Sequence, residues 1–290
     1  MVNKRKDLIK KIIAVAAICI VLLLMYAPII YMTVYSFTGA KTSGVWTGFD
    51  LKNYQNLFNS NNATGKAIWN AAKNTMLVAV VAGIVSTILG TLGAIGIHNI
   101  RNKHLKNSMD FITQIPIVNA EIVTGVSLFI LFLFFKNVLG LPRNFFTLVI
   151  GHVVLTLPYV VISVIPKLEQ MDPSLYEAAL DLGATRRQAL WKVIIPEIIP
   201  GILSGFMLSI TLSLDDFVIT EFTKPESGNF ETISTYVDNQ LSKGGLPPQM
   251  RAFTAVLFAV ILLVMIGMFV KTSIDTKKQR RLSSNKGELL

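Results

Sequence analysis

The sequence predicts an all-α membrane protein with six transmembrane helices. Of the 290 residues, 52% are hydrophobic and only 15% are charged, whereas charged residues make up about 25% of a typical soluble domain. Six apolar runs are each close to the roughly 20 residues that a helix needs to cross a bilayer. A lone span must be helical because a helix satisfies its own backbone hydrogen bonds in lipid. The predicted spans, which define a transmembrane domain of residues 12–270, are Ile12–Tyr35, Asn74–Ile97, Phe111–Phe135, Asn144–Ile165, Ile198–Thr220 and Ala252–Val270.

The first span follows a basic segment, as the apolar core of a signal peptide also does. Its 24 uncharged residues exceed the roughly 7–15 residues of such a core. No small-x-small cleavage pattern ends the run. We therefore expect it to be a retained helix, preceded by a short cytoplasmic N-terminus of residues 1–11.

Basic residues are distributed unequally between the two sides of the predicted bundle. With the N-terminus placed in the cytoplasm, 18 Lys and Arg residues fall inside and 9 fall outside. This positive-inside bias predicts that both termini are cytoplasmic. It also accounts for the net charge of +10, which no nucleic-acid recognition motif accompanies, so no nucleic-acid partner is expected. The basic segment 271–290 is predicted to be a flexible cytoplasmic tail near anionic lipid.

The sequence shows no pattern of a catalytic or metal site. Cys19 is the single cysteine, and the three histidines have no metal-ligand spacing. The H-E-x-x-H and G-x-S-x-G patterns of membrane-embedded hydrolases are absent. We expect no catalytic residues, no metal and no cofactor, and a hydrogen-bonded structural role for His152 inside the membrane.

The predicted cytoplasmic loop, residues 167–197, reads as a helix–turn–helix. Asp172 is suited to cap a helix whose first residue is Pro173. Gly183 stands where a glycine commonly ends a helix. A second helical stretch is then predicted to run as far as Pro196. The small residues of the first helix would allow another protein to approach closely.

Within this loop, the run Glu177-Ala178-Ala179, Gly183 and the ending at Pro196 resemble the EAA loop of bacterial ABC importer permeases. The resemblance implies the type I importer permease fold, in which a short coupling helix docks into a cytoplasmic ATPase subunit. No Walker A pattern occurs in the sequence, so the chain is not expected to be an enzyme and ATP hydrolysis would occur on that partner. The docking residues implied here are Glu177, Ala178, Ala179, Asp181, Gly183 and Pro196.

Three acidic residues occur within the predicted spans. Glu121 would lie roughly 15 Å along the third span, near the midplane, and Asp215 and Asp216 would lie near the outer end of the fifth. A charge in the bilayer interior costs at least about 2.5–3.5 kcal/mol, so such residues usually face a bundle interior or a water-filled path. We predict that they line a path for a cation, with Phe217 and Tyr159 as candidates for cation–π contacts. The alternatives are a hydrogen-bonded structural role for the glutamate and a helix-cap role for the aspartates, of which only one is expected to face the path.

The segments around these acids, Ser213–Thr220 and Pro116–Gly125, resemble those of spermidine/putrescine importer permeases of the PotC type. The resemblance implies polyamine import by alternating access in a bacterial plasma (inner) membrane. The implied partners are a second related permease, two copies of an ATP-binding subunit and an extracytoplasmic substrate-binding protein. The alternatives are a permease for another small solute (a thiamine-like cation, an anion or a sugar) and, from a different class, a secondary transporter or channel.

Overall fold

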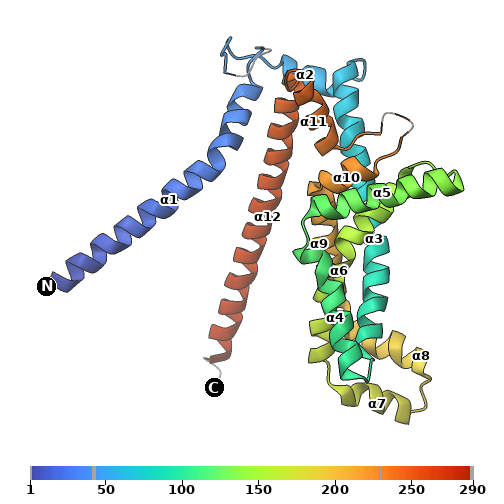
Figure 1. Ribbon diagram of the computed structural model, residues 1–290. Coiled ribbons are helices and arrows are strands. Elements are labelled where there is room, and N and C mark those ends of the chain that lie inside the picture. Colours follow the sequence, from blue (N-terminus) through green and yellow to red (C-terminus); the bar gives the residue numbers. More distant parts are fainter. Residues whose placement is uncertain (1, 41–43, 227, 229, 288–290) are drawn as a thin grey trace. The chain divides into compact units, whose positions relative to one another are not determined.

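The computed structural model describes residues 2–40, 44–226, 228 and 230–287, and every regular element among them is helical (Figure 1). The chain divides into two compact units, one made of Met1–Ile68 with Gly244–Leu290 and the other of Trp69–Lys243. Six of the described helical stretches are long and apolar enough to cross a membrane, as predicted. The elements are α1 (Val2–Ser36), α2 (Lys52–Phe58), α3 (Ala63–His98), α4 (Lys103–Val118), α5 (Glu121–Leu139), α6 (Phe145–Gln170), α7 (Pro173–Asp181), α8 (Arg186–Ala189), the π-helical turn η1 (Leu190–Ile194), α9 (Ile195–Asp215), α10 (Val218–Thr223), α11 (Ile233–Ser242) and α12 (Pro248–Gly287).

The predicted first, second and sixth spans lie within α1, α3 and α12, and the predicted fourth span lies within α6 except for its first residue, Asn144. α6 begins one residue late because Asn144 caps it and accepts hydrogen bonds from the backbone of Phe146 and Thr147. α12 continues beyond the predicted end of the sixth span as far as Gly287, so the part of the predicted tail up to that residue is helical. Residues 271–286 contain no proline or glycine that would end the helix. Residues 288–290 of the predicted tail lie outside the described residues.

The prediction of a continuous third span is wrong. α4 ends at Val118 and α5 begins at Glu121, with two residues in extended conformations between them. Pro116 weakens the end of α4 because it has no N–H to donate. Asn119 Nδ2 donates to Thr124 Oγ1 at 3.2 Å across the break. Glu121 therefore lies in the first turn of α5, where it is exposed, and not in the middle of one long helix.

The predicted fifth span is interrupted as well. α9 ends at Asp215, Asp216 is extended, and α10 begins at Val218. The Asp216 carboxylate accepts from the backbone N–H groups of Ile219 at 3.1 Å and Thr220 at 2.8 Å. A short acidic side chain that bonds the backbone competes with helical hydrogen bonds. Asp216 therefore ends one helix and caps the next.

Helices α3, α6 and α9 build the core of the unit 69–243. Buried residues of all three pack together, with Ala94 on α3, Val164 on α6 and Ile198 on α9 among them. Gly90 on α3 and Gly205 on α9 both face Val160 of α6, where an added Cβ would lie 2.8 Å and 3.0 Å from its atoms. Small residues at these positions let the helix backbones approach closely.

In the other unit, polar contacts hold the segment that follows α1. Asn53 of α2 donates through Nδ2 to the carbonyls of Ser36 at 3.0 Å and Thr38 at 2.8 Å. Arg251, buried at the start of α12, donates through Nη1 to the carbonyl of Ala40 at 3.2 Å. These bonds satisfy backbone carbonyls that no helix would satisfy.

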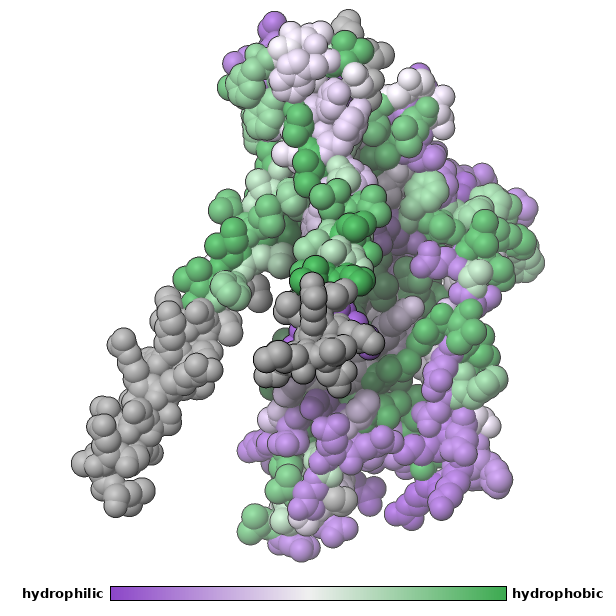
Figure 2. Space-filling model, turned by 90° about the vertical axis from the view of Figure 1, so that its left-hand side faces the viewer, coloured by the Kyte–Doolittle hydropathy of each residue, from purple (hydrophilic) through white to green (hydrophobic). Residues whose placement is uncertain are grey.

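The surface of the unit 69–243 changes in character along its length. Hydrophilic side chains gather at the end where Figure 1 places α7 and α8, and hydrophobic side chains lie above that end (Figure 2). A lipid-facing band bounded by a water-facing end produces this pattern. The loop that carries α7 and α8 is therefore at the water-exposed end of its unit.

Candidate functional site

The loop that resembles a coupling element forms a short, capped helix. α7 begins directly after Asp172, whose side chain accepts from the backbone N–H of Ser174 at 2.9 Å. The hydrogen bonds from Ser174, that of its backbone first, hold the pKa of Asp172 below its usual range. The start of the helix predicted at Pro173 is confirmed.

Gly183 ends this helix in the left-handed region, with a φ of +84°. The N–H of Gly183 donates to the carbonyl of Leu180 at 2.9 Å, and that of Ala184 donates to the carbonyl of Ala179 at 3.0 Å. These are the two bonds of the Schellman motif. A Cβ added to Gly183 would meet nothing within 4 Å. The glycine is therefore required by the backbone conformation and not by lack of space.

Most of the implied docking residues lie together on this helix. Glu177, Ala178 and Asp181 are exposed and Ala179 is half-buried, with Gly183 just beyond the helix end. Pro196 lies elsewhere, in the first turn of α9. The structure therefore presents α7 as one small surface that a partner could contact, and it assigns Pro196 to the span that follows.

The prediction that the second helical stretch ends at Pro196 is wrong. α8, η1 and α9 follow one another without a gap. A proline removes an N–H and its ring crowds the carbonyl four residues earlier. The wider π turn accommodates this, because the N–H of Ile195 donates to the carbonyl of Leu190, five residues before it. A displacement of α8 would consequently be passed directly to α9.

A pocket of about 400 Å³ lies between α7 and the ends of the longer helices. Glu177 of α7, Arg186 of α8 and His98 at the end of α3 line it, together with apolar residues such as Leu168. Glu177, although exposed, therefore also lines this pocket. Tyr176, in the middle of α7, packs against the core formed by α3, α6 and α9 beside this pocket.

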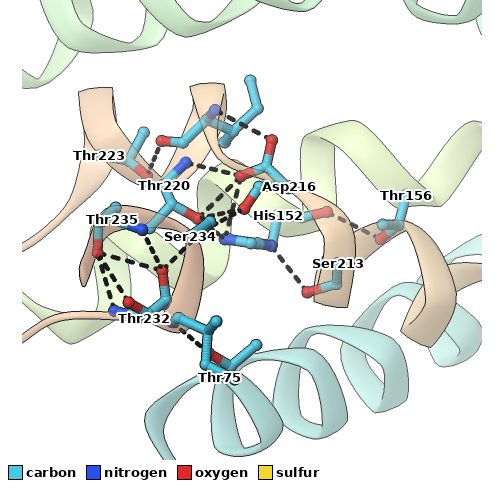
Figure 3. A network of polar contacts seen from close by, with 12 residues as sticks. Thr75, His152, Thr156, Ser213, Asp216, Thr220, Thr223, Thr232, Ser234 and Thr235 are labelled. Carbon is cyan, nitrogen blue, oxygen red and sulfur yellow. Dashed lines mark hydrogen bonds and ion pairs between the residues drawn. The ribbon is translucent and has the colours of Figure 1, made fainter. Parts of the chain in front are cut away.

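A second group of polar side chains surrounds Asp216, deep in the same unit (Figure 3). Asp216 is 6% exposed and His152 is 1% exposed. Thr220 Oγ1 donates to Asp216 Oδ2 at 2.8 Å and lies 3.0 Å from His152 Nε2. Ser213 Oγ lies 2.8 Å from His152 Nδ1. The hydrogen-bonded role predicted for His152 is confirmed, whereas the parts that Thr220 and Ser213 play depend on helix packing that no local pattern indicates.

The other predicted acids, Glu121 and Asp215, are both exposed. The space above Gly125 of α5 is taken by Phe222 and Val218 of α10, and Phe129 contacts the ring of Phe222 at 6.1 Å between centroids. α5 and α10 therefore run parallel to each other where they pack. The N-terminal turn of α5, with Glu121, and the break that follows Asp215 consequently lie at the same end of this helix pair.

The two aromatic candidates lie at different places. Phe217 is 36% exposed and stands in the break between α9 and α10, next to Asp216. Tyr159 is half-buried on α6, two helical turns or roughly 10 Å beyond His152 and on the same face. Within the described residues, no group of three or more His, Cys, Asp or Glu side chains could hold a metal ion.

Opposite charges hold the far end of α5 to the segment after α10. Glu226 accepts from Lys136 Nζ at 2.6 Å and from Arg143 Nε at 3.2 Å. Arg143 also donates to the carbonyl of Phe222 at 3.0 Å and lies over the ring of Phe129 at 4.8 Å. The hydrogen bond from Lys136, above all, lowers the pKa of Glu226. No local pattern in the sequence indicates these contacts, because the partners of Glu226 lie more than 80 residues away along the chain.

Residues 86–280 match a known family, described as the binding-protein-dependent transport system inner membrane component. That match covers more than half of the chain, including α7 and the whole region around Asp216. The chain belongs to this family. As a binding-protein-dependent transport permease, it is a membrane protein with several spans, and the family supplies transport systems with their inner membrane subunit.

Two curated relatives of this transport permease come from Escherichia coli strain K12. It is 30% identical over 259 residues to the putrescine transport system permease PotI, and the aligned region covers 88% of this chain and 89% of the relative. It is 31% identical over 244 residues to the spermidine/putrescine transport system permease PotC, and here the aligned region covers 83% of this chain and 87% of the relative. The predicted family resemblance is confirmed by these similarities.

Solved structures of importers share the fold of the transport permease. One chain of a bacterial ABC transporter that imports the acidic polysaccharide alginate aligns with a TM-score of 0.65 at 19% identity, over 91% of this chain and 96% of that one. A chain of the MetNI methionine ABC transporter aligns with a TM-score of 0.53 at 16% identity, over 71% of this chain and 90% of that one. The predicted importer permease fold is confirmed.

Proposed function

We propose that this permease is the membrane subunit of an ATP-driven importer of polyamines. The observation that carries the proposal is the similarity to permeases of putrescine and spermidine transport systems over more than four fifths of both chains. Polyamines are flexible aliphatic chains with two or more positive charges. A path for them needs exposed carboxylates within an otherwise apolar bundle, and Glu121 and Asp215 supply such groups at one end of the α5–α10 pair.

Coupling to ATP would occur through α7. This helix is short, exposed and capped at both ends, and its backbone continues through α8 and η1 into the span α9. Two copies of a cytoplasmic ATPase subunit would bind α7 of this chain and the matching helix of a second, related permease. Closure of the ATPase pair on ATP would move α7 and turn α9, which ends at Asp215. The path would thereby close on one side of the membrane and open on the other side.

The proposed orientation places α7 and both chain termini in the cytoplasm, in agreement with the excess of Lys and Arg on that side. The outer ends of the spans would then receive a substrate-binding protein that delivers the polyamine. Substrate charge would be matched first by Asp215 and Glu121, with Phe217 and Tyr159 available for cation–π contacts. The protein would reside in a bacterial plasma (inner) membrane.

The proposal is tested with the complete transporter reconstituted in proteoliposomes. ATP hydrolysis and uptake of labelled putrescine and spermidine are measured with the binding protein present, against equal concentrations of thiamine, a sugar and an anion as competitors. We expect stimulation and competition by polyamines alone. Stimulation by one of the other solutes, without any by polyamines, would overturn the substrate class. Uptake that continues without the ATPase subunits would overturn the coupling role of α7.

The path is tested by neutral substitutions of the acids. Asp215→Asn is expected to raise the KM for polyamine uptake several-fold, because it removes an exposed charge from the end of α9. Asp238→Asn is the matched control, because Asp238 is an exposed aspartate on α11 outside the proposed path. Equal KM values for both variants and the unchanged protein would remove Asp215 from the path.

A further inference from the structure

Four buried side chains form one continuous hydrogen-bonded chain through the region around Asp216. The chain runs from Ser213 Oγ to His152 Nδ1 at 2.8 Å, from His152 Nε2 to Thr220 Oγ1 at 3.0 Å, and from Thr220 Oγ1 to Asp216 Oδ2 at 2.8 Å. Every member is at most 6% exposed. The members come from α6, the end of α9, α10 and the break between the last two (Figure 3).

The chemistry of the groups fixes the direction of this chain. As a carboxylate, Asp216 can only accept, so the single hydroxyl proton of Thr220 is donated to it. Thr220 Oγ1 must then accept from His152, which places the imidazole proton on Nε2. Ser213 Oγ bonds the other ring nitrogen, Nδ1, as a donor to a neutral imidazole or as an acceptor from a protonated one, whose Nε2 lies 3.8 Å from Asp216 Oδ2. In either case the Nε2–H of His152 and the hydroxyl of Thr220 point toward Asp216.

Asp216 is held by its backbone as well as by its side chain. Its carboxylate also accepts from two backbone N–H groups at the start of α10, those of Ile219 and Thr220. Its own N–H donates to the carbonyl of Leu212 at 3.1 Å, and its carbonyl accepts from Ser234 Oγ of α11 at 2.9 Å. Both carboxylate oxygens are thus engaged by protein groups, and the residue joins α6, α9, α10 and α11 at one point.

The neighbouring acid differs in each of these respects. Asp215 is exposed, and it is the last residue of α9. Asp215 directly precedes the extended residue Asp216. The hydrogen bonds that fix the backbone of Asp216 therefore also fix the position of Asp215, at the end of α9, relative to α10. One of the two adjacent carboxylates is therefore available to a substrate, and the other is committed to the protein.

We propose that Asp216 is a positioning residue for transport: the directed chain Ser213–His152–Thr220–Asp216 fixes the break between α9 and α10 and so holds Asp215 in the path, while Asp216 itself does not bind the substrate. The inference rests on the proposed function, in which Asp215 lines the path of a cation. It identifies Asp215 as the one of the two adjacent acids that faces the path, a choice that the sequence leaves open.

The test breaks the chain at Thr220 without touching either acid. Thr220→Val keeps the shape of the side chain but removes the hydroxyl, which leaves His152 Nε2 without its acceptor and Asp216 without one of its donors. Thr220→Ser restores the hydroxyl. Thr223→Val is the matched control, because Thr223 is a buried threonine of the same helix whose hydroxyl donates to the carbonyl of Ile219, within its own helix. The complete transporter is used, and variants are compared at equal amounts in the membrane.

We expect Thr220→Val to raise the KM for putrescine about five- to tenfold, and Thr220→Ser and Thr223→Val to change it less than about twofold. A purely structural defect would lower the maximal rate or the amount of protein and leave the KM alone. An equal rise in KM in Thr220→Val and Thr223→Val would overturn the role of the hydrogen-bonded chain, because both variants remove one buried hydroxyl but only Thr220 belongs to that chain.

A double-mutant cycle separates the inference from the proposed function. If the chain acts through Asp215, adding Thr220→Val to Asp215→Asn raises the KM no further. If the two effects multiply, the positioning role of Asp216 is refuted while Asp215 keeps its place in the path. If Asp215→Asn has no effect by itself, the proposed path fails instead. A KM that rises on Asp216→Asn in the Asp215→Asn background, and more for spermidine than for putrescine, would show that Asp216 binds substrate and refute the proposal.

Discussion

Replacement of Gly183 tests the coupling role of α7 with a graded effect. Gly183 has a φ of +84°, and an added Cβ would meet no atom within 4 Å. The cost of a side chain is therefore backbone strain alone, about 1–2 kcal/mol for an ordinary L-residue in this region. Asparagine tolerates it best and a β-branched residue worst. The order of damage predicted at this position is Asn, then Ala, then Val.

The magnitude matters because α7 is short. With nine residues, it is below the roughly 12–15 at which an isolated helix becomes stable in water, and its C-terminal end depends on the two bonds of the Schellman motif. One to two kcal/mol of strain lowers the ratio of the ordered to the frayed C-terminal end of α7 by about 5- to 30-fold. Transport per ATP hydrolysed, measured in proteoliposomes, is expected to fall several-fold in Gly183→Val and only slightly in Gly183→Asn.

Gly140 provides the control for strain. It ends α5 with a φ of +68°, also with no atom within 4 Å of an added Cβ, so Gly140→Val introduces the same kind of strain away from α7. We expect this variant to keep the normal ratio of transport to ATP hydrolysis. Normal coupling in Gly183→Val at a normal membrane level, or equal defects in the two valine variants, would refute the docking role of α7.

Three further predictions concern other parts of the molecule. Gly125→Ala should lower the apparent melting temperature, because its Cβ would lie 2.7 Å from Phe222 Cδ2, whereas Gly96→Ala, with open space, should not. Asp172→Ala should weaken coupling by removing the N-cap of α7, and Asp172→Asn should restore it. Glu226 has a folded-state pKa below its ordinary 4.5, so its contribution to stability is present above that value and is lost as pH falls through the lowered pKa. The unchanged protein should therefore lose melting temperature over this acid range more steeply than Glu226→Gln.

Local signals in the sequence account for the helix ends that were predicted correctly. Asp172 is a short polar side chain that can reach free N–H groups, and Gly183 accepts a backbone conformation that other residues avoid. Each signal acts within four residues. The apolar runs likewise predict six spans, because burial in lipid depends on composition over about 20 residues and not on distant contacts.

The two helix breaks could not be predicted from such signals. An apolar run of more than 20 residues reads as one span whether or not it is interrupted. The break at Asp216 involves a side chain that bonds the backbone of the next helix, and the break at Asn119 involves a side chain that bonds the side chain of Thr124. Two groups around Asp216 lie far from it in the sequence: His152 is 64 residues before it and Ser234 is 18 residues after it. Sequence distance also hides the ion pairs of Glu226. The substrate path stays a prediction, because it would form between this chain and a second, related permease.

The breaks also explain how acidic residues are tolerated among apolar spans. A helix that begins inside the bundle has N–H groups without helical partners and a partial positive charge at its start. Asp216 occupies that position at α10, and Glu121 occupies it in the first turn of α5. The charge of each is offset by the helix end that it caps or accompanies. Asp215 has the opposite placement.

Asp215 lies at the C-terminal end of α9, where the helix contributes partial negative charge. Its carboxylate adds to that charge and is not offset by it, so this end of α9 attracts a cation more strongly than the start of α5 does. We therefore expect Asp215→Asn to raise the KM for a polyamine more than Glu121→Gln does, and to do so more for spermidine, with its additional charge, than for putrescine. Uptake kinetics with both substrates measure this directly. A larger effect of Glu121→Gln would mean that the helix ends do not govern which acid meets the substrate.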